Sequence, residues 1–106
     1  LKNKSNMNTN GLSVYFLESD EVDMYVLAAS YYDAANSVDM ELMGTIKFSC
    51  EELAHNMYVE KVDDYGVMWR VLVDDLLRDL QTQHGDFEKI DMSKGYFVLS
   101  ELHKEQ

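Results

Sequence analysis

After a polar stretch, the chain opens with two short apolar runs, residues 14–17 and 24–29. Both runs are rich in β-branched and aromatic residues, and the acidic segment 18–21 separates them. Apolar runs on either side of a short polar turn predict a β-hairpin. Runs of the same kind predict a third strand over residues 40–48 and a last strand over residues 95–100.

Two segments begin with residues that are typical of helix N-termini. Ser30, with an aspartate three residues later and a pair of alanines after that, predicts a short helix. Ser49 and Glu52 fit a capping box, because a serine at the N-cap and a glutamate at the third helical position satisfy each other's backbone N–H groups. The sequence therefore predicts a first main helix over residues 50–60.

A second main helix is predicted over residues 67–84. Asp74 and Arg78 are spaced to form an ion pair on its polar face, and Gly85 suits the position just after its end. Its apolar face is predicted from residues that recur at helical spacing: Trp69, Leu72, Val73, Leu76 and Leu80.

These elements together predict an α+β fold. We expect a small, mostly antiparallel sheet of three or four strands, with two main helices packed on one of its faces. Residues 1–11 are rich in Asn, Ser and Lys and predict a flexible N-terminal tail. Residues 12–106 have the length of a single α+β domain.

The net charge of the chain restricts the range of possible functions more than any sequence motif does. The chain has 106 residues, of which 20 are acidic and nine are basic, for a net charge of −11. Such a chain repels nucleic acid and anionic membranes and attracts basic surfaces. One cysteine, no long apolar run and no signal peptide favour a cytoplasmic location.

The residues that most often carry catalysis are poorly arranged here. Cys50 would lie in the first turn of the predicted helix, where the helix dipole lowers a thiol pKa, but Glu51 and Glu52 oppose a thiolate. The three histidines lack metal-ligand spacing, and there is no Cys-x-x-Cys pair. We therefore expect no enzyme activity, no cofactor and no metal site.

Acidic residues on predicted turns and on the polar face of the second helix are the best candidates for partner binding. On a helix such carboxylates lie about 5–6 Å apart, close to the spacing of phosphates along a nucleic-acid strand. The candidates are Asp74, Asp75, Asp79, Asp63, Asp64, Glu18, Asp20 and Glu21. Tyrosines that could add buried anchors to this surface are Tyr31, Tyr32, Tyr58 and Tyr65.

In size and charge the chain resembles the small acidic inhibitors that phages and other mobile elements make against host nucleases, among them DNA mimics and further anti-defence proteins. The resemblance is one of composition, so it assigns no residue. It implies an inhibitor that occupies the basic nucleic-acid-binding surface of a partner protein such as a nuclease. Two alternatives stay open: an immunity protein or antitoxin that neutralises a basic toxin, and a small ligand-binding or enzymatic domain. The sequence also leaves open whether the chain forms a homodimer.

Overall fold

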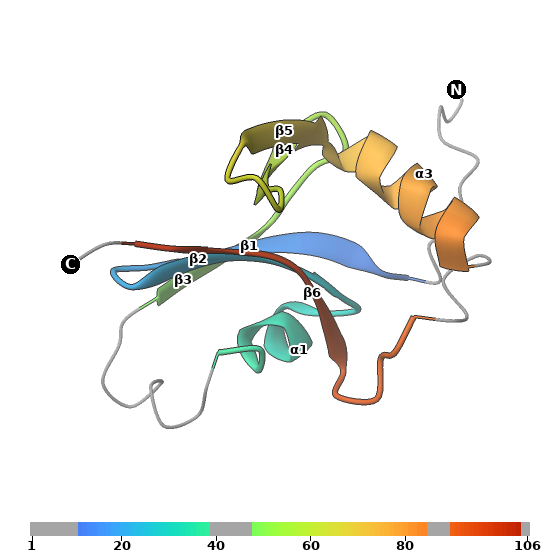
Figure 1. The fold of residues 1–106 in the computed structure, drawn as a ribbon. Helices are drawn as coiled ribbons and strands as arrows, with labels where there is room; N and C mark the ends of the chain where they lie inside the picture. Colours follow the sequence, from blue (N-terminus) through green and yellow to red (C-terminus); the bar gives the residue numbers. More distant parts are fainter. Residues whose placement is uncertain (1–10, 39–47, 85–89, 105–106) are drawn as a thin grey trace.

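A computed structural model of the chain describes residues 11–38, 48–84 and 90–104, and strands dominate in these ranges (Figure 1). Helix α3 is longer than any other helix in them. In chain order the elements are β1 (Ser13–Ser19), β2 (Val22–Ala28), α1 (Tyr31–Ala35), β3 (Phe48–Glu52), β4 (Tyr58–Val62), β5 (Met68–Leu72), α3 (Val73–His84) and β6 (Tyr96–His103).

The first two strands form the predicted hairpin, and they are the centre of a four-stranded sheet in the order β3-β1-β2-β6. All three strand pairs in this sheet are antiparallel. Phe16 and Tyr25 lie opposite each other in the hairpin, with their ring centroids 4.8 Å apart. Aromatic pairs of this kind stabilise a sheet beyond the area that they bury. The predicted last strand is confirmed as β6.

Side chains alternate between the two faces of a sheet along each strand. In the central sheet both faces carry buried apolar side chains. Figure 1 shows α3 and the β4–β5 hairpin on one face and α1 on the other. Leu27 of β2 and Leu77 of α3, both fully buried, belong to the cluster under α3 and the hairpin. Val26 and Ala34 belong to the cluster under α1, which begins after the predicted N-cap, Ser30. The Oγ atom of Ser30 accepts a hydrogen bond from the backbone N–H of Asp33.

The predicted fold class is wrong, because the described residues are mostly β and do not place two main helices on one face. The predicted helix over residues 50–60 is replaced by strand β3, a turn and strand β4. Ser49 therefore caps no helix: it lies on β3, opposite Glu18 of β1. Antiparallel pairing with β1 prevails here over a local helix signal, as tertiary context often does.

The second predicted helix is only partly correct. Helix α3 begins at Val73, and the preceding five residues form β5. Val73, Leu76 and Leu80 are buried as predicted, but Trp69 lies on β5 with 56% of its surface exposed. The backbone N–H of Val73 donates to the carbonyl of Met57 at 2.8 Å, so the turn before β4 holds the start of the helix.

Several predictions lie outside the described residues: the tail before Gly11, the third strand up to Phe48, and the position of Gly85. Neither helix that the structure describes has the length and apolar character needed to cross a membrane.

Candidate functional site

Exposed hydrophobic side chains gather on the β4–β5 hairpin. Nine large hydrophobic residues are exposed in the described ranges, and seven of them lie between residues 57 and 69. The strand register places Tyr58, Val62 and Met68 on one face of the hairpin and Trp69 on the other. Exposed apolar residues that are concentrated on one element mark binding sites more often than scattered ones do. The seven are Met57, Tyr58, Val62, Tyr65, Val67, Met68 and Trp69.

The turn of this hairpin is built around Asp63. The backbone N–H of Gly66 donates to the Asp63 carbonyl, and Gly66 has a φ of 81°, which glycine adopts without strain. The Oδ1 atom of Asp63 accepts from the backbone N–H groups of Tyr65 and Val67, both at 2.9 Å. Tyr65 is thereby held at the tip of the hairpin with 90% of its surface exposed.

Asp63 also fixes the single tryptophan. The indole Nε1–H of Trp69 donates to Asp63 Oδ2 at 2.8 Å. This bond, more than those from Val67 and Tyr65, holds the pKa of the Asp63 carboxyl below its usual value. The indole N–H of Trp69 therefore already has an acceptor within the chain.

The outer face of the hairpin combines aromatic and charged groups. Glu60 and Arg70 lie opposite each other in the register, with Arg70 Nε 3.8 Å from Glu60 Oε2. The Arg70 guanidinium lies 5.1 Å from the centroid of the Tyr58 ring, a cation–π geometry. The Oγ of Ser100 donates to the Glu60 carbonyl at 2.9 Å and so ties the hairpin to β6.

Beside Trp69 the surface is hollowed into an open groove of about 330 Å³. Trp69 and Lys61 are opposite each other in the register, on the strand face that also carries the buried Val59. The groove is lined by Lys61, Val62, Asp63, Asp64, Trp69 and Val71. It therefore brings one tryptophan and two aspartates together around one space.

The acidic residues that the sequence predicted for α3 are less free than expected. Asp74 Oδ2 lies 3.0 Å from Arg78, and Asp74 Oδ1 lies 3.3 Å from Nδ1 of His55. Asp75 is 3.9 Å from the same arginine, whereas Asp79 is exposed. The predicted ion pair between Asp74 and Arg78 is confirmed, and it neutralises part of the predicted patch.

The β1–β2 turn carries a second predicted group of acids, which Lys104 contacts. The Nζ of Lys104 donates to the Ser19 carbonyl at 2.7 Å, and it lies 3.1 Å from Asp23 and 3.9 Å from Glu18. Asp20 and Glu21 are exposed at the tip of this turn, and Asp64 is exposed at the tip of the β4–β5 hairpin. The structure thus separates the predicted acids into three places rather than one face.

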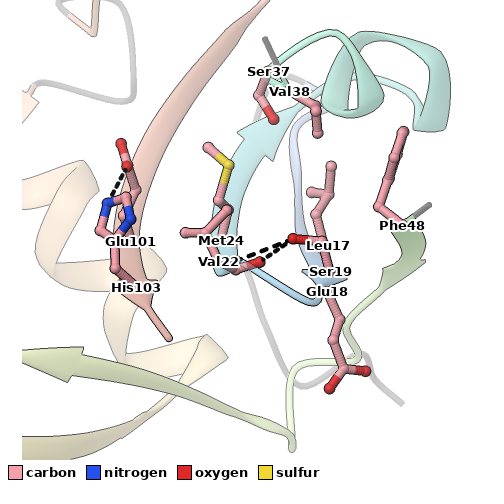
Figure 2. Close-up of a pocket in the computed structure, with 10 residues that line it drawn as sticks. All are labelled: Leu17, Glu18, Ser19, Val22, Met24, Ser37, Val38, Phe48, Glu101 and His103. Carbon is pink, nitrogen blue, oxygen red and sulfur yellow. Dashed lines mark hydrogen bonds and ion pairs between the residues drawn. The ribbon is translucent and has the colours of Figure 1, made fainter. Parts of the chain in front are cut away.

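A second hollow, of about 190 Å³, lies on the α1 face of the sheet. Figure 2 shows Leu17, Met24 and Val38 turned toward this space, while Glu18 points away from it. Its volume is below the roughly 300 Å³ at which small-molecule sites usually begin. This hollow therefore gives little support to the ligand-binding alternative.

Cys50 is not at a helix N-terminus, where the sequence predicts it, but on strand β3. It is half-buried, and burial raises the pKa of its thiol, which disfavours the reactive thiolate. Within residues 11–38, 48–84 and 90–104, no three His, Cys, Asp or Glu side chains are grouped so that they could hold a metal ion.

Sequence reasoning placed Trp69 in the core and did not select Arg70. It did select Tyr31, Tyr32, Tyr58 and Tyr65, all of which are exposed, although the first two lie on α1 and the others on the hairpin. Two segments rich in β-branched and aromatic residues, 58–62 and 67–72, flank residues 63–66, and this was the signal that could have revealed the hairpin.

No family model, curated protein or solved structure matches this chain.

Proposed function

We propose that this chain is a small acidic binding protein that docks through its β4–β5 hairpin on a basic protein and blocks a nucleic-acid-binding surface there. The observation that carries the proposal is the concentration of seven of the nine exposed large hydrophobic side chains on residues 57–69. Leaving such a surface in water is unfavourable, so a partner that covers it would be stabilised by its burial.

The chemistry of the hairpin supports a protein partner. Tryptophan, tyrosine and arginine dominate the energetics of protein interfaces, and the hairpin exposes Trp69, Tyr58, Tyr65 and Arg70. The hydrogen bonds to Asp63 fix the turn and the indole before a partner arrives. An interface that is ordered in advance loses less conformational entropy on binding.

The charge supports a basic partner. At a net charge of −11, the chain would associate with a cationic surface faster than a neutral protein of its size. Asp64 lies at the hairpin tip beside the apolar residues, so attraction and apolar burial would act on the same surface of the partner. Carboxylates seated on such a surface would exclude phosphates from it.

Site-specific photo-crosslinking tests where the partner binds. A benzophenone amino acid replaces Tyr65, which is 90% exposed on the hairpin, and in a matched control it replaces Tyr32, which is 73% exposed on α1. Irradiation in cells of the source organism should join a basic, nucleic-acid-binding protein to position 65 and not to position 32. Crosslinks from position 32 alone, or to an acidic protein, would contradict the proposal.

Binding kinetics with that partner test what the hairpin contributes. Trp69→Ala should weaken binding by about tenfold or more, as truncation of an interface hot spot does, whereas Tyr32→Ala should leave it within about twofold. Nucleic acid should compete with the wild-type chain for the partner. If Trp69→Ala binds as well as wild type, the interface is elsewhere.

A further inference from the structure

The groove beside Trp69 has a chemistry that the proposed docking surface does not yet explain. Trp69, which is 56% exposed, and the two aspartates Asp63 and Asp64 are among the residues that line it. The Asp63 carboxylate serves the turn and the indole, whereas Asp64 is exposed at the tip of the hairpin. An aromatic ring next to anionic oxygens is suited to a planar cation.

The protein already uses this combination once, on the outer face of the same hairpin. There the Arg70 guanidinium lies over the Tyr58 ring and next to the Glu60 carboxylate. The groove offers Trp69 in place of the tyrosine and an aspartate in place of the glutamate, but the structure places no guanidinium of the described residues in its lining.

We propose that this groove binds an arginine side chain of the basic partner, an inference that rests on the proposed function. The guanidinium stacks on the Trp69 ring and donates to the carboxylate of Asp64. Asp63 positions the ring rather than meeting the ligand first, because its carboxylate accepts from the indole N–H and from two backbone N–H groups. Asp64 is exposed and is therefore the first carboxylate that an incoming cation meets.

Arginine fits this groove better than lysine does. A guanidinium is planar, so it can stack on an aromatic ring and still donate two parallel hydrogen bonds to a carboxylate. An ammonium is a compact, strongly hydrated charge that can neither stack flat on the ring nor donate to the carboxylate in this parallel geometry. Lys61 also lines the groove, and its positive charge repels any cation that binds there. With two aspartates and one lysine in the lining, the net charge of the groove is negative.

The indole N–H of Trp69 gives a direct measurement, because the chain has one tryptophan and hence one indole resonance. We would follow this resonance by ¹H–¹⁵N NMR while adding blocked tripeptides, Ac-Gly-X-Gly-NH₂, in which X is arginine, lysine or citrulline. Citrulline has nearly the shape of arginine without its charge. The arginine peptide should shift the resonance saturably, and it should bind at least about fivefold more tightly than the citrulline peptide.

Two substitutions that change the charge of the groove in opposite directions test the role of its lining residues. Asp64→Asn should lower the affinity for the arginine peptide by about two- to fivefold, and Lys61→Gln should raise this affinity by a similar factor. Asp79→Asn on α3 is the matched control and should leave the affinity unchanged. Equal affinities for arginine and citrulline, tighter binding of lysine, or no effect of Asp64→Asn would overturn the assignment.

The outcomes separate this inference from the proposed function. In one outcome, the peptides show no preference for arginine while position 65 crosslinks to a partner and Trp69→Ala weakens binding to that partner. In that case the hairpin docks without an arginine subsite. If arginine binds in the groove but no partner depends on the hairpin, the docking proposal fails instead.

Discussion

The β4–β5 hairpin and helix α3 follow each other directly in the chain, yet their exposed surfaces differ in character: the hairpin exposes apolar side chains and the helix exposes charged ones. The hairpin leaves Tyr58, Met68 and Trp69 about half exposed. Helix α3 buries its leucines in the core, and its first acid, Asp74, pairs with Arg78. An acidic composition therefore does not locate a binding site, because acids can form ion pairs within the molecule, whereas a concentration of exposed apolar side chains is harder to explain without a partner.

Truncation of a buried and an exposed apolar residue should give the largest difference between the two elements. Leu77 of α3 is fully buried, so Leu77→Ala should destabilise the fold by about 2–5 kcal/mol. Met68 of β5 is 52% exposed, and Met68→Ala should change stability by less than about 0.5 kcal/mol. Urea denaturation measures both. Similar losses in the two variants would mean that the hairpin surface is part of the core.

Low pH should destabilise the hairpin by protonating the carboxylate of Asp63. Hydrogen bonds from the Trp69 indole, and then from Val67 and Tyr65, keep its pKa below the usual aspartate value of about 3.9. The ionised form therefore stabilises the hairpin fully above that usual value, and its contribution is lost as pH falls toward the lower pKa of the folded state. Trp69 fluorescence should change in this range.

A matched pair of variants identifies the group responsible for this acid transition. Asp63→Asn should abolish the change in Trp69 fluorescence below about pH 4, because the amide does not titrate. Asp91 also has a lowered pKa, caused by its hydrogen bonds with Ser93, but it lies outside the hairpin. Asp91→Asn should leave the tryptophan transition in place. A transition that survives Asp63→Asn would assign the acid sensitivity to another group.

The same comparison shows how far the sequence could predict the fold. The first hairpin was predictable, because two apolar runs flank a short acidic turn and pair locally. Residues 48–53 were not, because their capping signal is local, whereas the residues of β1 with which they pair lie 29 to 37 positions earlier in the chain. Helical spacing continued from α3 back to Trp69, and this continuity hid strand β5.

The candidate site was less predictable than the fold. Charge and residue type selected Asp63, Asp64, Tyr58 and Tyr65, which the structure brings to one hairpin. The sequence could not show that Asp63 accepts the indole N–H of Trp69, since that bond exists only once the hairpin forms. Nor could it show that Lys104, far along the chain, contacts the β1–β2 turn.

Removal of the arginine on α3 should have a smaller effect than core truncation. Arg78→Ala breaks the i,i+4 pair with Asp74, and such pairs on helices contribute about 0.3–0.5 kcal/mol. The loss should shrink in 1 M salt, because the side chain of Arg78 is 56% exposed and its charge is screened. A double-mutant cycle with Asp74→Asn in urea denaturation measures the coupling. A coupling above about 1 kcal/mol would show that α3 relies on charge more than the comparison allows.

The smallest effect should come from Asp79, the exposed member of the predicted acidic patch. Asp79 lies six residues beyond the start of α3, or about 9 Å along its axis at 1.5 Å per residue. That is about one Debye length at physiological ionic strength, and Figure 1 shows the helix leading away from the hairpin. Asp79→Asn should therefore leave stability within about 0.5 kcal/mol. In stopped-flow association with the partner it should slow binding less than Asp64→Asn does at every salt concentration. The opposite order would place the contact on α3, where charge alone had predicted it.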